Sequence, residues 1–133
     1  MQEVFDFLSI AGVYHIATVD REGKPHVRPF GSKLIVDGKF YISCSLPKHV
    51  YDQLSGQKWC EISAMGTDRE YIRISATARE VTDPSEKEKV YASSAYVTRP
   101  VGGVMRSISD VAFFELTDAT ATIYSKETKV YRW

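Results

Sequence analysis

The segment GKPHVRPFGS, residues 23–32, contains two prolines four positions apart, with a histidine and an arginine between them. The flanking sequences VYHIATV (residues 13–19) and KLIV (residues 33–36) are rich in the β-branched and aromatic residues that are typical of strands. Because proline has no backbone N–H for a neighbouring strand, we expect this strand to be irregular at Pro25 and Pro29. The sequence therefore predicts a β protein with one unusual strand near its N-terminus.

This unusual strand has the chemistry of an anion site. Arg28 stands between the prolines and would present a planar, permanently charged guanidinium group. Backbone groups left without strand partners would be free to bond a ligand, and Gly31 would let a flat ring approach the backbone. The alternative is an edge strand whose prolines only prevent aggregation, with Arg28 on the surface.

A second candidate anion site follows in SCSLPKHVYDQ, residues 43–53. Ser43 and Ser45 end a predicted strand, and we expect Ser45 to cap a helix that ends at Gly56. Lys48 would lie in the first turn of this helix, where free N–H groups and the two hydroxyls complete a phosphate site. The alternative is an ordinary capped helix with a lysine in solvent.

The rest of the chain predicts short strands and two further helices. Asp83 and Pro84 mark the start of one helix, and the Asp-Gly pair at residues 37–38 marks a hairpin. Six or so strands with short turns predict a mainly β fold, an antiparallel barrel with short helices at its rim, in a single domain of residues 1–133. We expect helices at about 2–11 and from 84 onward, strands at 13–19, 25–36, 39–45, 58–65, 71–81 and 110–125, a loop at 96–109 and a tail at 126–133.

Composition excludes several classes of function. The 133 residues carry 17 basic and 17 acidic side chains, so the formal net charge is zero and there is no electrostatic footprint for nucleic acid. No signal peptide or membrane span is evident, and Cys44 and Cys60 read as buried thiols, so we expect a cytoplasmic protein without a membrane partner. No catalytic signature is present, and His15, His26 and His49 have no spacing that predicts a metal site.

Some predicted strands are apolar on both faces. Phe113 and Phe114 are adjacent, so their side chains should point to opposite faces of one strand. A chain of this length is not expected to bury both faces in one core. We therefore expect a second copy of the chain to cover one of them.

The two candidate anion sites together describe one ligand. It would carry a terminal phosphate bound by Arg28 and Lys48, and a planar part lying along Phe30 and Gly31. Flavin mononucleotide (FMN) has both features.

Four stretches support this interpretation by resemblance. In chain order they are YHIATVDREGKPHVRPFG, DGKFYISCSLPKHVYDQL, EYIRISATAREVTD and FFELTDATATIYS. They resemble the pyridoxamine 5'-phosphate oxidase-like family of FMN-binding split β-barrels, in particular its small general-stress-protein and nitroimidazole-resistance-like members. The resemblance covers about residues 4–125.

The resemblance implies a six-stranded split barrel and a homodimer with two flavin sites at the subunit interface. The residues that would bind the FMN phosphate are Arg28, Ser45, Lys48 and Gln53. Those that would lie at the ring are His26, Pro29, Phe30, Gly31, Ser43 and Cys44. The other subunit would contribute Arg73 and, from the 101–106 loop, Arg106.

The expected function is that of a flavin-dependent oxidoreductase acting with a small-molecule electron donor or acceptor, with no catalytic residue identified. Cys44 stands where many relatives have threonine, so a structural dimer that has lost its ligand is a further alternative. The C-terminal extension associated with pyridoxal phosphate binding is not evident, so pyridoxamine 5'-phosphate oxidase activity is not expected. A flavin carrier or sensor without turnover would have the same sequence features. So would the same barrel binding a deazaflavin or haem, with His26 or His49 as the haem ligand.

Overall fold

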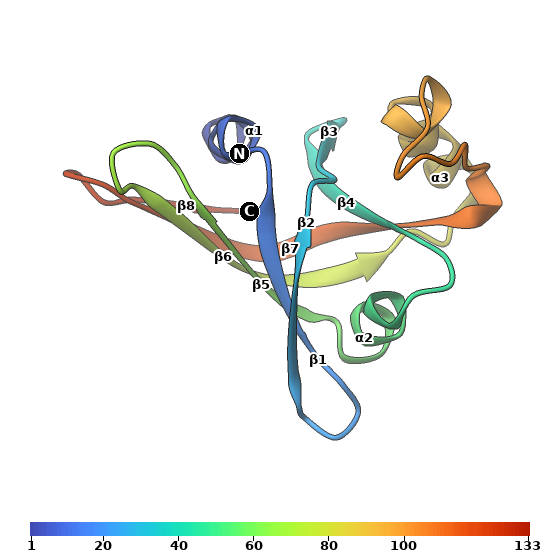
Figure 1. Ribbon diagram of the computed structural model, residues 1–133, viewed down its shortest axis with the longest axis horizontal. Helices are drawn as coiled ribbons and strands as arrows, with labels where there is room; N and C mark the ends of the chain where they lie inside the picture. The colour runs from blue at the N-terminus through green and yellow to red at the C-terminus, as the bar shows by residue number, and fades with distance from the viewer.

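The computed structural model describes all residues from 1 to 133, and it is built mainly from antiparallel strands (Figure 1). Three short α-helices and two single-turn 3₁₀-helices, η1 and η2, accompany the strands. In chain order the elements are α1 (Gln2–Ala11), β1 (Tyr14–Val19), β2 (Pro25–Phe30), β3 (Leu34–Val36), β4 (Lys39–Ser45), α2 (His49–Gln57), β5 (Trp59–Met65), β6 (Tyr71–Glu80), α3 (Pro84–Ala92), η1 (Ala95–Val97), η2 (Ile108–Asp110), β7 (Val111–Tyr124) and β8 (Lys129–Arg132).

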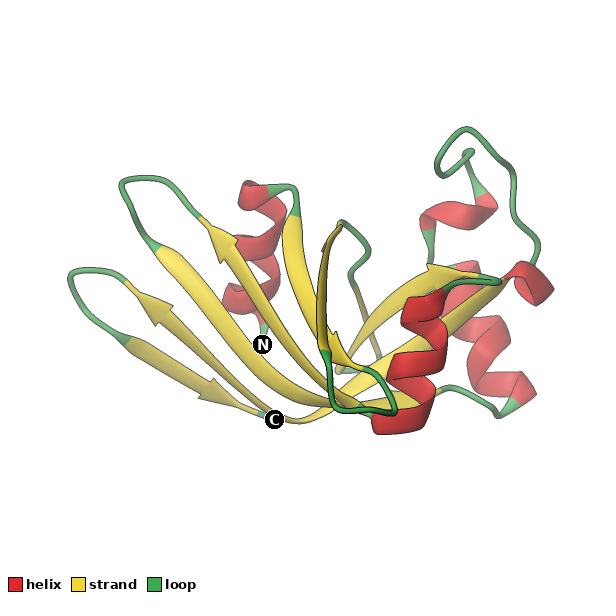
Figure 2. Ribbon diagram, turned by 60° about the horizontal axis from the view of Figure 1, so that its bottom comes forward, coloured by secondary structure: helices red, strands yellow, loops and turns green.

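All strands belong to one curved, antiparallel sheet with the order β2-β1-β5-β6-β7-β4-β3, and β8 pairs with the far half of β7. The sheet is not closed, and Figure 2 shows its strands spreading as a fan away from α2 and α3. This arrangement confirms the expected mainly β, split-barrel class.

The sheet has eight strands where six were expected. The segment predicted as one strand at 25–36 is interrupted at residues 31–33, so that β2 pairs with β1 while β3 pairs with β4. The predicted tail pairs with β7, and the backbones of Ala119 and Trp133 exchange two hydrogen bonds beyond the end of β8. Neither change alters the fold class.

Both faces of β7 are buried within this single chain. Phe114 belongs to the main core cluster of 22 residues, which also receives α1 and α2. Phe113 lies on the opposite face in a smaller cluster of 7 residues that includes Val90 of α3 and Tyr96 of η1. For β7 the expectation that a second copy covers one face was therefore wrong, because α3 and η1 cover it, while the expected dimer itself stays a prediction.

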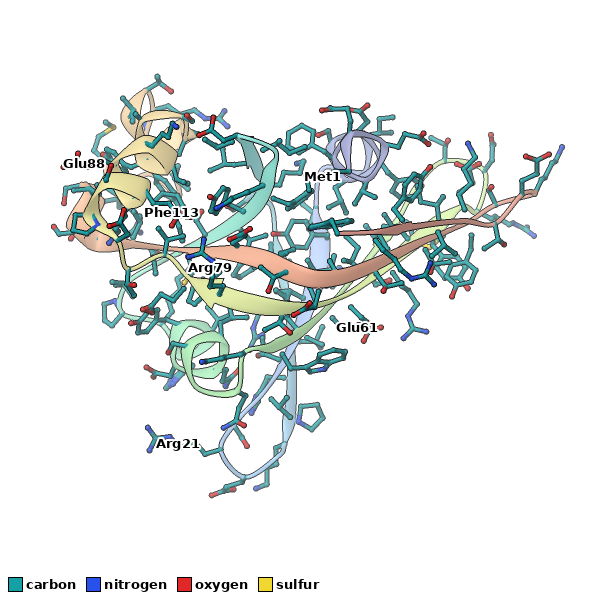
Figure 3. All side chains as sticks on the ribbon, turned by 180° about the vertical axis from the view of Figure 1, so that it is seen from behind. Met1, Arg21, Glu61, Arg79, Glu88 and Phe113 are labelled. Atoms are coloured by element: carbon teal, nitrogen blue, oxygen red, sulfur yellow. The ribbon has the colours of Figure 1, made fainter.

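An ionic network fastens α3 to the sheet. Arg79 of β6 donates to Glu86 of α3 and to Glu115 of β7, and Glu86 also accepts from the Tyr41 hydroxyl at 2.8 Å. Figure 3 shows Arg79 beside β7, below the α3 helix. Asp83 caps α3 as expected, since its carboxylate accepts from the backbone N–H of Glu86 at 2.9 Å.

Helix α2 starts later than the sequence predicted. Ser45 does not cap it, because Ser45 still pairs with Val111, and Leu46 N donates to Asp110 O. The strand pairing thus holds the chain extended, and Lys48 becomes the N-cap residue rather than part of the first turn. The helix passes Gly56 and ends at Gln57.

The segment at 96–109 is mostly loop, as expected. It carries η1 and η2 and one narrow turn, where Val101 and Val104 exchange backbone hydrogen bonds around Gly102 and Gly103. Both glycines have positive φ, of 64° and 77°, which other residues adopt at a cost. Tyr91 holds the far end of this turn through a hydrogen bond of 2.7 Å to Arg106 O. None of the three α-helices is long and apolar enough to cross a membrane.

Candidate ligand-binding site

Strand β2, the end of β4 and the start of α2 converge on one cleft of about 570 Å³. The two candidate anion sites of the sequence therefore belong to one site in the structure. The predicted residues that line this cleft, which we call the main cleft, are Arg28, Pro29, Phe30, Gly31, Ser43, Cys44, Ser45, Lys48 and Arg106.

Strand β2 is more regular than its prolines suggested. It pairs with β1 along its whole length, from Pro25 opposite Val19 to Phe30 opposite Tyr14. In an antiparallel pair only every second residue forms hydrogen bonds with the partner strand. The hydrogen bond from Asp20 N to Lys24 O shows that Lys24, and with it every second residue after it, bonds β1. Pro25 and Pro29 then direct their ring nitrogens to the free edge of the sheet, so no strand hydrogen bond is lost.

Arg28 is anchored by side chains from two other elements. Its Nη1 donates to Thr18 Oγ1 at 2.6 Å and its Nη2 donates to Gln53 Oε1 at 2.8 Å. Thr18 Oγ1 also donates to Gln53 Oε1 at 2.5 Å. Gln53, on α2, is thus part of the site by holding Arg28, and Thr18, which sequence reasoning did not identify, is a buried polar residue of β1.

The main cleft is positively charged. Arg28, Lys48 and Arg106 all line it, and none of them forms a salt bridge with a carboxylate. Burial lowers the pKa of Arg28 from its ordinary value, so the fold itself does not stabilise this charge. A bound anion would stabilise all three cations at once.

The cysteine of the main cleft keeps its thiol proton at neutral pH. Cys44 is buried at the end of β4, and burial raises the pKa of its thiol to about 11. The group therefore remains a thiol at neutral pH and is a weak hydrogen-bond donor. Both cysteines of the chain are free and buried, as expected.

Three predicted residues do not line the main cleft of this chain: Gln53, which contacts it only through Arg28, and His26 and Arg73. His26 shares a face of β2 with Arg28 but lies nearer the hairpin tip, where its Nε2 is 2.8 Å from Asp20 Oδ2. Arg73 of β6 pairs with Glu61 of β5 at 2.5 Å. The assignment of Arg73 to the site of another subunit stays a prediction. Arg106, which the resemblance also assigned to the other subunit, lines the main cleft of its own chain.

A second cavity of about 460 Å³ adjoins the main cleft. The two share the wall formed by Gly31, Ser32, Ser43, Tyr96 and Val101. The second cavity adds two cations, Lys33 and Arg99, and apolar surface from Phe5 and Leu34. Lys33 Nζ lies 5.9 Å from the centre of the Phe5 ring, and burial lowers the pKa of the Lys33 ammonium group.

The second cavity adds residues that sequence reasoning missed. Ser32 and Lys33 directly follow Gly31 in the chain, whereas Tyr96 and Arg99 lie in the segment after α3, which carries no ligand motif. Only the tertiary fold brings Tyr96 and Arg99 beside Gly31. No group of three or more histidine, cysteine, aspartate or glutamate side chains is arranged to hold a metal ion.

Comparison with known proteins supports the family resemblance seen in the sequence. The family model described as pyridoxamine 5'-phosphate oxidase matches residues 1–123. The chain belongs to this family. No curated protein matches it in sequence.

Several solved structures share the fold of this pyridoxamine 5'-phosphate oxidase family member. A NimC/NimA family protein from Clostridium acetobutylicum has 26% identity and a TM-score of 0.83, with 100% of this chain and 93% of that one covered. A protein from the same organism related to general stress protein 26 has 15% identity and a TM-score of 0.68, over 98% and 92%. A pyridoxamine 5'-phosphate oxidase-related, FMN-binding protein from Nostoc punctiforme has 14% identity and a TM-score of 0.64, over 99% and 95%.

Further structural relatives take different cofactors. A haem-binding protein from Mycobacterium smegmatis has 12% identity and a TM-score of 0.67, over 95% of this chain and 55% of that one. An F420 reductase has 15% identity and a TM-score of 0.60, over 84% and 89%. At these identities the likeness shows the fold alone.

Proposed function

We propose that this protein binds FMN in the main cleft and acts as a flavin-dependent oxidoreductase. The observation that carries the proposal is the convergence of Arg28, Lys48 and Arg106, without carboxylate partners, on a cleft that also contains the hydroxyl of Ser45. Three cations and a hydroxyl suit a phosphate dianion.

The cleft also suits the remainder of the molecule. A volume of about 570 Å³ lies within the range of cofactor sites, roughly 300–1,000 Å³. Pro29, Phe30 and Gly31 provide a wall of backbone and ring carbon for a flat group. When bound, FMN would supply hydride or electron transfer, while the chain's own residues bind its phosphate, orient its ring and limit access of water.

The second cavity would receive the substrate. Lys33 and Arg99 offer two positive charges that form no salt bridge, and Phe5 and Leu34 offer apolar contact. This combination favours a small organic anion with a planar or apolar body. The shared wall would place such a molecule next to the occupant of the main cleft.

We also propose a homodimer as the active unit, as the family resemblance implies. Val97, Val104 and Met105 are exposed apolar side chains around the loop that borders both cavities. A second copy would cover them. Light scattering that shows a stable monomer at micromolar concentration would contradict this part of the proposal.

The function is tested by the absorption spectrum of the purified protein before and after FMN is added. A flavin spectrum, quenched fluorescence and micromolar or tighter binding would support the proposal. Oxidation of NADPH or NADH by the FMN-loaded protein would distinguish an oxidoreductase from a carrier. A Soret band would indicate that the protein binds haem and not FMN. Preferential binding of F420 would indicate that its cofactor is this deazaflavin.

A further inference from the structure

Three hydroxyls form a continuous chain in the wall between the two cavities. Ser43 Oγ lies 2.5 Å from Ser32 Oγ and 3.0 Å from Tyr96 Oη. Ser43 and Tyr96 are buried in the protein, and all three side chains line both the main cleft and the second cavity. We call this set the hydroxyl chain.

The number of hydrogens fixes what the hydroxyl chain can do. Ser32 Oγ already accepts from the backbone N–H of Ser43 at 2.9 Å. Three hydroxyl hydrogens serve only two contacts, so one hydrogen remains free, and it lies at an end of the hydroxyl chain whenever Ser43 donates to one of its two neighbours. If Tyr96 donates to Ser43 and Ser43 to Ser32, the free hydrogen lies on Ser32. In the reverse direction it lies on Tyr96.

We propose that Ser32, Ser43 and Tyr96 form a proton relay between the two cavities, and that Tyr96 is the catalytic acid that protonates the substrate. This inference rests on the proposed function, because it takes the second cavity as the substrate site. The reversal of the hydrogen-bond direction is the event that moves a proton through the wall.

The remaining groups of the second cavity do not compete for this role. No aspartate, glutamate, histidine or cysteine lines it. The hydroxyls of Ser9 and Ser94 donate to backbone carbonyls of their own segments, at 2.8 and 2.6 Å. Lys33 and Arg99 are the cations assigned to the substrate's charge. Tyr96 remains, and burial raises its pKa, so it holds its proton at neutral pH.

The step balances for a quinone acceptor. Reduction to the quinol needs two electrons and two protons, equivalent to one hydride and one proton. FMN, when bound and reduced, would supply the hydride, and the hydroxyl chain would supply the proton. The Tyr96 O–H bond breaks as the quinol O–H forms, Tyr96 regains a proton from Ser43, Ser43 from Ser32, and Ser32 from water in the main cleft.

The experiment uses the FMN-loaded protein, reduced beforehand, with 1,4-naphthoquinone-2-sulfonate as the anionic acceptor. Tyr96→Phe is expected to lower the first-order rate of reduction at saturating acceptor by about 100-fold. It should also remove the solvent isotope effect that the wild type shows in D₂O. Tyr51→Phe is the matched control, because the Tyr51 hydroxyl bonds Glu80 outside both cavities.

A double variant tests whether the hydroxyls act as one unit. Ser43→Ala alone should slow the reaction, whereas adding Ser43→Ala to Tyr96→Phe should change the rate by less than about two-fold. Rates for Tyr96→Phe within about two-fold of wild type, or independent effects of the two substitutions, would overturn the relay.

A readout without flavin separates this inference from the proposed function. Proton NMR of the protein without cofactor should show slowly exchanging Ser43 and Tyr96 hydroxyl protons, and Ser43→Ala should accelerate exchange at Tyr96. Failure of the wild type to bind FMN would refute the proposed function and the acid role of Tyr96. Rapid exchange of both hydroxyl protons in the wild type would refute the hydroxyl chain itself.

Discussion

Replacement of Arg28 by alanine should weaken FMN binding strongly while leaving the fold intact. A charge-assisted hydrogen bond to a phosphate contributes about 1.5–3 kcal/mol, which corresponds to a rise in Kd of roughly 10- to 160-fold. The guanidinium uses its two Nη1 N–H groups for Thr18 Oγ1 and Ile16 O and one Nη2 N–H for Gln53, so two more N–H groups remain for the ligand.

The structure indicates that this substitution lowers the affinity for FMN without lowering the stability of the fold. Without Arg28, Thr18 still donates to Gln53 at 2.5 Å, so neither group loses its last partner. Burial lowers the pKa of Arg28, which means that the charge is unfavourable in the cofactor-free protein. Loss of the hydrogen bonds from Arg28 to Thr18, Gln53 and Ile16 opposes the gain from removing this charge, so we expect the free energy of unfolding of the cofactor-free variant to stay close to that of the wild type.

The assay is a fluorescence titration of FMN into wild type, Arg28→Ala and Arg21→Ala, with urea denaturation of each protein without FMN. Arg21 is a matched control, since it is exposed in the turn of the β1–β2 hairpin (Figure 3). A Kd for Arg28→Ala within about two-fold of wild type would show that the guanidinium does not bind the phosphate. Equal losses of affinity in both variants would point to general electrostatics instead.

Three further predictions concern stability. Arg79 holds the pKa of Glu86 below its ordinary value of 4.5, so this stabilisation is present above that pH and is lost as pH falls through the lowered value. Glu86→Gln should therefore reduce the fall in urea midpoint between about pH 7 and about pH 3, and an unchanged fall would contradict this. Phe113→Ala should cost about 3–5 kcal/mol at every protein concentration, because α3 and η1 bury the ring, whereas a concentration-dependent cost would implicate a second copy. Asp83→Ala should cost about 0.5–2 kcal/mol in urea denaturation with Asp83→Asn retaining most of the stability, and equal losses in both would exclude the capping role.

The sequence predicted turns, helix starts and charged candidate residues correctly where these depend only on neighbouring residues in the chain. The Asp-Gly pair at residues 37–38 forms the two-residue turn between β3 and β4, with positive φ at both residues. The cap and proline at 83–84 start α3. The candidate anion residues Arg28 and Lys48 were also chosen from chain-local signals, and the structure brings both to one cleft.

The start of α2 was predicted wrongly because a distant strand decides it. Ser45 has the side chain of a helix cap, but its pairing with Val111 of β7 keeps the backbone extended. Likewise, the tail contains no strong strand signal, and it becomes β8 because β7 extends far enough beyond β4 to offer a free edge.

By itself, the sequence determined the type of most local elements and identified Arg28 and Lys48 as residues with ligand chemistry, because turns, caps and side-chain charge act over a few bonds. Only the tertiary structure decided which groups meet. Tyr96 and Arg99 became neighbours of Gly31, and Phe113 is buried within its own chain, because α3 and the 96–109 segment pack against β4 and β7. Such meetings depend on packing between segments tens of residues apart, which no local pattern encodes.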